Sequence, residues 1–334
     1  MTDAFKVAVI GCGSIGKRHI GNLIARGVAP ARIVALDTRE DRRAEVTARF
    51  GVERVCAKLE EVLDEKAAAA IVCSPTSFHV GQATALVEHG MDVLIEKPLG
   101  HTLEGVEALE AALARHGRQA LVAYCFRFSP HGEKLREVVQ SGVVGEPLYV
   151  RGEFSEYLPD WHPWEDYRSF YMAKRSLGGG SLLDQSHVLD MAHFCLGEIA
   201  SVYAFNGKVS GLEVEADDLA EMVVRFRSGL VGSIHQDMFG RQHKKYVEVK
   251  CTRGNVVWDV YDLSVSVYHA DDRRHETFTF GKDHQVMYLR EIDHFLDVVR
   301  RAAAPRCSLA DGVHGMRALM AAARAAESGR EEKV

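Results

Sequence analysis

The chain of 334 residues lacks any long apolar run. A membrane-spanning helix needs about 20 consecutive apolar residues, and the first residues show no charged-then-apolar secretion leader. Positive charge is not in excess either, since 41 Lys and Arg stand against 47 Asp and Glu, a net charge of −6. Nucleic-acid binding requires a concentrated basic face. We therefore expect a cytoplasmic protein with small-molecule partners rather than membrane or nucleic-acid partners.

The cysteines and histidines lack the spacing of a disulfide framework or a metal site. The seven cysteines are scattered, odd in number and without CxxC pairs, and most lie in apolar runs as small hydrophobic residues. The 16 histidines form no metal-spaced cluster, and internal repeats are missing. We expect no metal. With 47 % hydrophobic residues, the chain is typical of about two globular domains.

The first 124 residues alternate apolar strands with helices, which is typical of a right-handed, doubly wound parallel sheet. A glycine motif, GCGSIG, stands between the first predicted strand and the first helix. In that context glycines permit a tight turn and close approach of backbone to a pyrophosphate, at a helix N-terminus. A glycine turn without a ligand is the alternative. The expected dinucleotide contacts are Gly11, Gly13, Ser14, Ile15 and Gly16.

Asp37 ends the second predicted strand, about 20 residues after the last glycine. A carboxylate there binds the ribose hydroxyls of NAD and repels the 2′-phosphate of NADP. Asp37 could instead cap a helix. Arg39 leaves NADP open, because its guanidinium could face a 2′-phosphate or stack on adenine. The sequence thus favours NAD, with NADP possible.

Further polar residues follow the ends of later strands. Ser74, Pro75 and Thr76 form a loop expected to face the cofactor, and His79 begins the next helix, where it contacts cofactor or caps the helix. The strand at residues 91–95 stops at Glu96, Lys97 and Pro98, since proline cannot donate to a sheet ladder. Alone, this tripeptide is most simply a solvated turn. At the sheet edge that carries the glycine loop, it predicts the meeting point of cofactor and substrate.

After residue 124 the pattern changes to a second domain, residues 125–334. Residues 157–170 are irregular and rich in aromatic side chains, which bind sugar rings or simply pack a connection between domains. A basic residue near the start of this half, Arg127, is a further candidate. The predicted substrate contacts here are Arg127, Trp161, Trp164, Tyr167 and Arg168, with His162 in the same segment.

Residues 177–197 contain three consecutive glycines and then a helical pattern that Ser181 could cap. Asp184 and His187 are three residues apart, so one helix would place them on one face. A carboxylate beside an imidazole can tune it for proton transfer near neutral pH. A surface Asp/His pair is the alternative.

Short alternating segments after residue 199 predict an antiparallel sheet, followed by helices at residues 287–301 and 312–328 and a frayed end from residue 329. The free face of this sheet could pair with another subunit. We therefore expect a homodimer or homotetramer formed through the sheet.

Taken in order, these motifs resemble the Gfo/Idh/MocA oxidoreductase family, over about residues 6–328. The resemblance implies an N-terminal Rossmann domain and a C-terminal α/β domain with a large open, mostly antiparallel sheet. It also implies an NAD or NADP cofactor and a cyclic sugar or polyol substrate. Lys97 matches the family's active-site lysine, often followed by a cis peptide bond. Asp184 and His187 match its Asp/His pair, although many relatives space that pair by four residues rather than three.

The expected reaction is hydride transfer between nicotinamide and a secondary hydroxyl of a sugar, sugar acid, polyol or nucleotide-linked sugar. Lys97 would polarise the reacting oxygen, His187 would accept its proton, and Asp184 would orient the imidazole or bind a neighbouring hydroxyl. Lys97 and His187 could exchange roles. Two alternatives are sugar elimination or epimerisation through transient oxidation, and nicotinamide binding without turnover.

Overall fold

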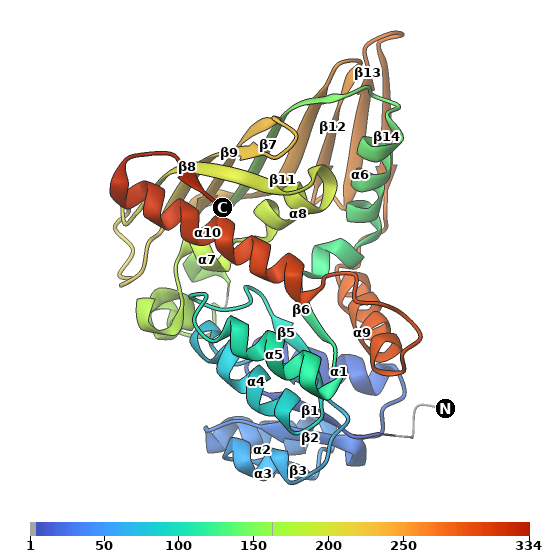
Figure 1. The fold of residues 1–334 in the computed structure, drawn as a ribbon, viewed down its shortest axis with the longest axis vertical. Helices are drawn as coiled ribbons and strands as arrows, with labels where there is room; N and C mark the ends of the chain where they lie inside the picture. Colours follow the sequence, from blue (N-terminus) through green and yellow to red (C-terminus); the bar gives the residue numbers. More distant parts are fainter. Residues whose placement is uncertain (1–4, 162) are drawn as a thin grey trace. The chain divides into compact units, whose positions relative to one another are not determined.

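The computed structural model describes residues 5–161 and 163–334. The chain divides into two compact units (Figure 1), of which the first contains Met1–Cys125 and Gln285–Val313 and the second contains Phe126–His284 and His314–Val334. The expected single boundary after residue 124 differs from this division in one respect. The segment Gln285–Val313 belongs to the first unit, because apolar residues of its helix, such as Ile292 and Phe295, complete the core of that unit.

The first unit contains a six-stranded parallel sheet of order β3-β2-β1-β4-β5-β6. Its central strands are fully buried, as expected for a parallel sheet covered on both faces. The predicted doubly wound fold is confirmed. Strand β3 was not predicted, because it has only three residues, two of which are not buried, and so it lacks the apolar run of a core strand. The strands are β1 (Val7–Ile10), β2 (Ile33–Leu36), β3 (Arg54–Cys56), β4 (Ala69–Val72), β5 (Asp92–Glu96) and β6 (Ala120–Ala123).

The helices of this unit follow the strands in alternation. The strand order reverses between β1 and β4, so the loops after these two strands lead away in opposite directions and leave a crevice at their carboxyl ends. Residues 11–13 and 73–75 therefore lie where open α/β sheets bind ligands. The helices are α1 (Ser14–Ala25), α2 (Glu40–Phe50), α3 (Leu59–Leu63), α4 (His79–Glu88), α5 (Val106–His116) and α9 (Gln285–Val299).

The second unit contains a nine-stranded sheet of order β14-β13-β12-β11-β7-β10-β9-β8-β15. Paired strands run antiparallel except β7 and β10, so the predicted large, mostly antiparallel sheet is confirmed. The predicted frayed end is wrong, because Glu332 and Lys333 pair with β8. The strands are β7 (Pro147–Tyr157), β8 (Ile199–Gly207), β9 (Leu219–Phe226), β10 (Val231–Asp237), β11 (Phe239–Cys251), β12 (Gly254–Asp259), β13 (Ser264–His269), β14 (Arg274–Thr279) and β15 (Glu332–Lys333).

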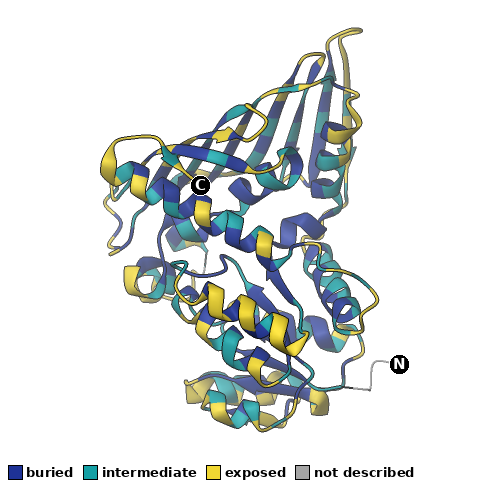
Figure 2. Ribbon diagram, in the orientation of Figure 1, coloured by how far each residue is buried: buried dark blue, intermediate teal, exposed yellow. Residues whose placement is uncertain are grey.

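One face of this second sheet is covered and the other is open. In β9 the residues alternate, with Ala220, Met222 and Val224 buried and the residues between them largely exposed. Figure 2 shows this alternation along the strands. Helix α6 (Pro130–Ser141) contacts β12 and β13, and α8 (His187–Leu196) contacts β7 and β11 on the covered side. The remaining helices are α7 (Ser181–Asp184) and α10 (Leu309–Ser328).

All seven cysteines are buried free thiols. Burial raises the pKa of Cys12 to about 12 and that of Cys195 to about 12, so these side chains act as packing residues rather than nucleophiles. Among the described residues, no helix combines the length and apolar character that crossing a bilayer requires.

Candidate functional site

The glycine loop after β1 has the geometry of a dinucleotide cradle. A Cβ at Gly16 would lie 1.9 Å from the carbonyl oxygen of Gly11, and Gly11 itself has φ of +94°. At Gly13 the added Cβ would meet no atom closer than 3.9 Å, which leaves room for a ligand against the backbone. Helix α1 begins at Ser14 without a side-chain cap. Its first N–H groups and its dipole therefore suit the pyrophosphate of NAD.

Asp37 lies beside this loop at the end of β2. Its Oδ2 accepts a hydrogen bond of 2.8 Å from the N–H of Cys12, and its Oδ1 accepts one of 2.9 Å from the N–H of Arg39. The carboxylate is 5 % exposed, and each oxygen retains capacity for a ribose hydroxyl. Helix α2 has Arg39 rather than Asp37 at its N-cap position. The two acceptor oxygens of Asp37 therefore fit the hydroxyl groups of the adenosine ribose of NAD.

Arg39 turns toward Asp41 instead of Asp37. Its Nε donates to Asp41 Oδ1 at 3.0 Å on the exposed surface. This hydrogen bond lowers the pKa of Asp41 to about 2. The neighbouring carboxylates of Asp37 and Asp41 disfavour a 2′-phosphate. Two guanidinium groups are also close, since Arg42 lies 3.5 Å from the Asp37 carboxylate and Arg43 donates to the Asp37 carbonyl oxygen at 2.8 Å.

The loop after β4 is stabilised by hydrogen bonds to other residues of the same unit. Ser74 Oγ donates to Gln82 Oε1 at 2.7 Å, and Thr76 is buried. His79 is fully buried, with Nδ1 3.0 Å from the carbonyl oxygen of Pro98 and Nε2 2.8 Å from that of Ser74. The prediction that His79 contacts cofactor does not fit this geometry, because both ring nitrogens face backbone carbonyls. Its imidazole joins the 74–76 loop to the turn after β5.

Lys97 follows β5 at the same sheet edge as the glycine loop, and the predicted cis Lys97–Pro98 peptide bond is confirmed. Glu96 Oε1 lies 2.8 Å from Nε2 of the fully buried His19 in α1. The N–H of Lys97 donates to Glu96 Oε2 at 3.2 Å. Glu96 therefore connects the turn at Lys97 to α1. Its carboxylate supports this turn internally, in place of the predicted contact with the cofactor.

Glu291 in α9 was not predicted as a site residue. It is fully buried, and neither carboxylate oxygen has a hydrogen-bond partner within the described part of the chain. Burial, together with the nearby charge of Glu96, raises the pKa of Glu291 well above its usual range. Cys73, Cys125 and Tyr288 are close enough to interact electrostatically with Glu291, and burial raises their pKa values as well. Glu291 is therefore protonated more readily than an exposed glutamate.

In the second unit the predicted single helix carrying Asp184 and His187 is wrong. Helix α7 ends at Asp184 and α8 begins at His187. Between them, the side chain of buried Gln185 donates to the carbonyl oxygen of Asp237 at 2.7 Å, and Gln236 donates to the carbonyl oxygen of Gln185 at 2.8 Å. These hydrogen bonds to β10 stabilise the break between α7 and α8. Asp184 and His187 therefore lie on either side of a turn that is anchored to the sheet.

The N-terminus of α7 and the glycines before it are also organised by tertiary contacts. Asp217 Oδ2 accepts hydrogen bonds from Ser181 Oγ at 2.8 Å and from the N–H of Leu182 at 2.9 Å. Gly180 has φ of +113°, and a Cβ there would lie 2.1 Å from Asp217 Oδ1. Asp217 caps this helix in place of the predicted Ser181. The glycines therefore permit close internal packing at the start of this helix.

Asp184 and His187 have well-defined surroundings. Tyr171, which sequence reasoning missed, donates from Oη to Asp184 Oδ1 at 2.5 Å, and Asp184 is 5 % exposed. The imidazole of His187 lies 4.6 Å from the ring of Phe126 and 6.4 Å from that of Phe154, between centroids. Aromatic walls and a fixed carboxylate are what a proton-transferring imidazole at a sugar site needs.

Arg127 is an internal residue. It is 2 % exposed, its Nη2 lies 2.7 Å from Asp190 Oδ1, and its guanidinium lies 5.1 Å from the centre of the Phe194 ring. The predicted substrate contact does not fit, because the guanidinium is engaged by a buried carboxylate on α8. Arg127 and Asp190 instead join residues 125–128 to α8.

The aromatic segment 157–170 mostly packs the protein itself. Trp161 and Tyr167 are partly buried against a small core that includes Leu158, Phe170 and Met238. Arg168 is exposed and paired with Asp166 at 2.9 Å and Glu213 at 2.8 Å, whereas Trp164 is 76 % exposed. His162 lies outside the described residues. These contacts favour the packing alternative for Trp161 and Tyr167, whereas Trp164 is an exposed aromatic side chain of the segment.

Comparison with known proteins gives matches across both units. The model described as "Oxidoreductase family, NAD-binding Rossmann fold" (GFO_IDH_MocA) matches residues 5–124, and the "GFO/IDH/MocA C-terminal domain" matches residues 133–257.

Among curated proteins, the chain is 28 % identical to the myo-inositol 2-dehydrogenase of Thermotoga maritima, with 98 % of each chain covered. It is 26 % identical to the levoglucosan dehydrogenase of Pseudarthrobacter phenanthrenivorans, covering 83 % of this chain and 80 % of the relative. Among solved structures, a levoglucosan dehydrogenase in complex with NADH and levoglucosan has a TM-score of 0.88 at 23 % identity, with 99 % of each chain covered. That structural likeness supports the fold.

Proposed function

The chain belongs to the Gfo/Idh/MocA family of NAD-binding oxidoreductases, and from this premise we propose that it oxidises a secondary hydroxyl group of a sugar or polyol. The relatives named inositol and levoglucosan dehydrogenase support this substrate class. The observation that carries the proposal most directly is the Asp184–His187 turn, where Tyr171 fixes the carboxylate and aromatic rings flank the imidazole. The cytoplasm stays its predicted location.

The nicotinamide of bound NAD supplies the hydride acceptor. The glycine loop and Asp37 would hold the dinucleotide, with selectivity for NAD over NADP. His187 accepts the proton of the substrate hydroxyl, and Asp184 orients the imidazole or binds a neighbouring hydroxyl. Lys97 donates a hydrogen bond to the same oxygen and stabilises its developing negative charge. The roles of Lys97 and His187 could be exchanged.

The assignment is tested by Lys97→Ala and His187→Ala. Each substitution should lower kcat by about 10²–10⁴-fold, because each removes a positioned proton donor or acceptor. Affinity for NADH, measured by calorimetry, should stay unchanged in His187→Ala, because that side chain lies in the second unit, and the same measurement on Lys97→Ala separates a cofactor contact of Lys97 from its role in the reaction. Lys58→Ala, at the start of α3, serves as the control. Undiminished turnover in both variants would show that the chemistry lies elsewhere. Bulk accumulation of NADH with substrate separates net oxidation from transient oxidation.

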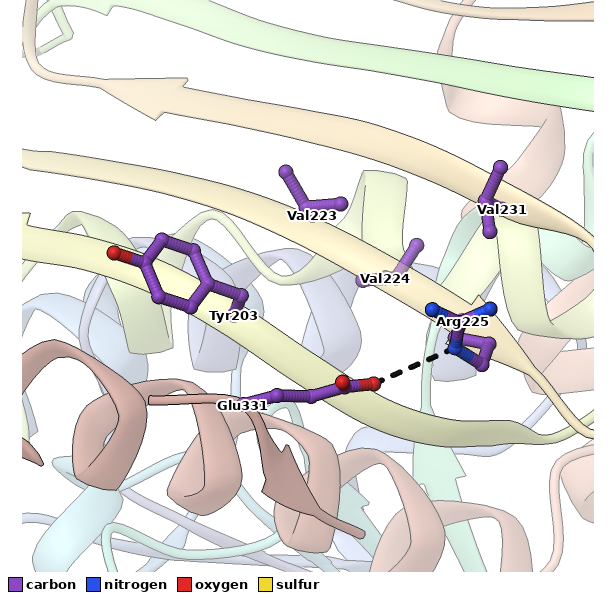
Figure 3. A pocket seen from close by; sticks show the side chains of 6 residues that line it. All are labelled: Tyr203, Val223, Val224, Arg225, Val231 and Glu331. Carbon is purple, nitrogen blue, oxygen red and sulfur yellow. Dashed lines mark hydrogen bonds and ion pairs between the residues drawn. The ribbon is translucent and has the colours of Figure 1, made fainter. Parts of the chain in front are cut away.

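The open face of the second sheet supports the homodimer or homotetramer proposed for this chain. Tyr203, Phe205 and Val223 are each at least half exposed on β8 and β9. Exposed apolar groups gathered in this way are typical of interaction surfaces. A cavity of about 320 Å³ on this surface is lined by Tyr203, Val223, Arg225 and Glu331, among others. Figure 3 shows these side chains, of which Arg225 and Glu331 form an ion pair of 3.4 Å. We call this surface the open face.

A further inference from the structure

A buried ion pair lies on the covered face of the second sheet, beside His187. Lys245 Nζ is 3.0 Å from Glu156 Oε1, and the two side chains are only 13 % and 12 % exposed. Lys245 pairs with Phe154 across β11 and β7, and Glu156 lies two residues beyond Phe154, so all three share one face. Helix α8, which begins at His187, contacts both strands.

The ammonium group is close to the proposed proton acceptor. Lys245 Nζ lies 3.8 Å from the centre of the Phe154 ring, and that ring lies 6.4 Å from the His187 ring. The two distances place Nζ within about 10 Å of the imidazole. One sugar ring with a hydrogen bond at each side can bridge such a distance.

Aromatic rings surround the ammonium group of the pair, since Lys245 Nζ lies 3.8 Å from the ring centre of Phe154 and 5.7 Å from that of Tyr261. The neighbours of the pair on the covered face are apolar, including Phe126, Val247 and Trp258. Removing two charges from water is costly, and a buried pair is weak evidence for stability. A few polar groups set among aromatic rings are typical of ligand sites, so a charged pair in this place near His187 is a candidate for substrate binding.

The pair also keeps free hydrogen-bonding capacity. An ammonium has three N–H donors, and within the described residues Lys245 uses one of them, on Glu156. Glu156 Oε1 accepts from Tyr261 as well, whereas its Oε2 has no protein partner among the described residues. A donor and an acceptor are therefore presented side by side.

We infer that Lys245 and Glu156 form a substrate subsite for two adjacent hydroxyl groups of a neutral sugar or polyol. One hydroxyl accepts a hydrogen bond from Lys245 and its neighbour donates to Glu156 Oε2. The pair has no net charge, so it offers a carboxylate substituent no excess positive charge, and the Glu156 carboxylate would repel that substituent. This subsite rests on the proposed function and selects neutral rings over sugar acids.

The test uses the full-length enzyme with NAD and matched substrates: glucose against glucuronate, galactose against galacturonate, and myo-inositol. Lys245→Met should raise KM for the best neutral substrate by about tenfold or more, with kcat within about threefold, because a hydrogen bond from a charged donor is lost. Glu156→Gln should shift the ratio of kcat/KM toward the uronates by about tenfold or more, because Lys245 then lacks its counter-charge. The matched controls are Lys244→Met and Glu153→Gln, a pair 3.7 Å apart on the opposite face of the same strands.

Binding of the same sugars to the enzyme–NADH complex, measured by saturation-transfer NMR, is run in parallel. If no sugar reduces NAD in the wild type, the proposed function fails, and the binding series still decides the subsite. Unchanged KM and unchanged sugar affinity in Lys245→Met and Glu156→Gln would overturn the inference. So would a wild-type preference for uronates that Glu156→Gln leaves intact. If Lys245→Met does not fold, Glu156→Gln carries the comparison alone.

Discussion

Single residues decide which part of the sequence pattern is functional. Polar residues at strand ends predicted ligand contacts, yet His79 faces two carbonyl oxygens and Arg127 faces Asp190. Sequence shows that such residues lie near the sheet edge but not whether their polar atoms are engaged inside the protein. Tyr171 and Lys245 show the reverse error, because the sequence did not predict either as a site residue. Their partners, Asp184 and Glu156, are distant along the chain or on another strand.

At the residue scale, Glu291 predicts a specific dependence of stability on pH. Its pKa is raised in the folded state, so the folded protein binds more protons than the unfolded chain above the ordinary pKa of glutamate. Its contribution to stability is present at acid pH and is lost as the pH rises toward the folded pKa. Glu291→Gln, which stays neutral, should remove this loss.

The measurement is urea unfolding between pH 5 and pH 8. The free energy of unfolding of the wild type should fall relative to that of Glu291→Gln, by up to about 1.4 kcal/mol for each pH unit. Glu110→Gln, an exposed substitution on α5, provides the control. Parallel pH curves for wild type and Glu291→Gln would contradict a neutral Glu291.

At the scale of elements, periodicity was a good guide wherever one face is buried. The short alternating segments after residue 199 predicted an antiparallel sheet, and β9 shows why, because its residues alternate regularly between buried and exposed. The break between α7 and α8 was missed, since residues 181–196 carry a continuous helical pattern. Hydrogen bonds from Gln185 and Gln236 to distant backbone impose the break, and no local pattern reports them.

The open face gives the prediction that belongs to this scale. Val223→Glu places a charge among Tyr203 and Phe205, where burial against a second copy would leave it uncompensated. We expect sedimentation velocity to show a dimer or tetramer for the wild type and a smaller species for the variant. Glu221→Gln on the same strand serves as a control for charge change. A monomeric wild type would contradict the proposed assembly.

For the whole molecule, the order of motifs identified the family and both sheets, because a Rossmann unit and a large open sheet leave regular patterns of strands and helices. The division of the chain was harder to predict. Gln285–Val313 returns to the first unit and His314–Val334 then belongs to the second unit again, and sequence order alone does not indicate such returns.

The central claim is that the protein transfers hydride from a sugar or polyol carbon to NAD. The most direct measurement supplies NAD with carbon-deuterated neutral sugars and cyclitols and follows NADH by absorbance and mass spectrometry. The account predicts that at least one of them reduces NAD in bulk and that the NADH formed carries one deuterium. Absence of NADH across the panel, or NADH without deuterium, would contradict the claim.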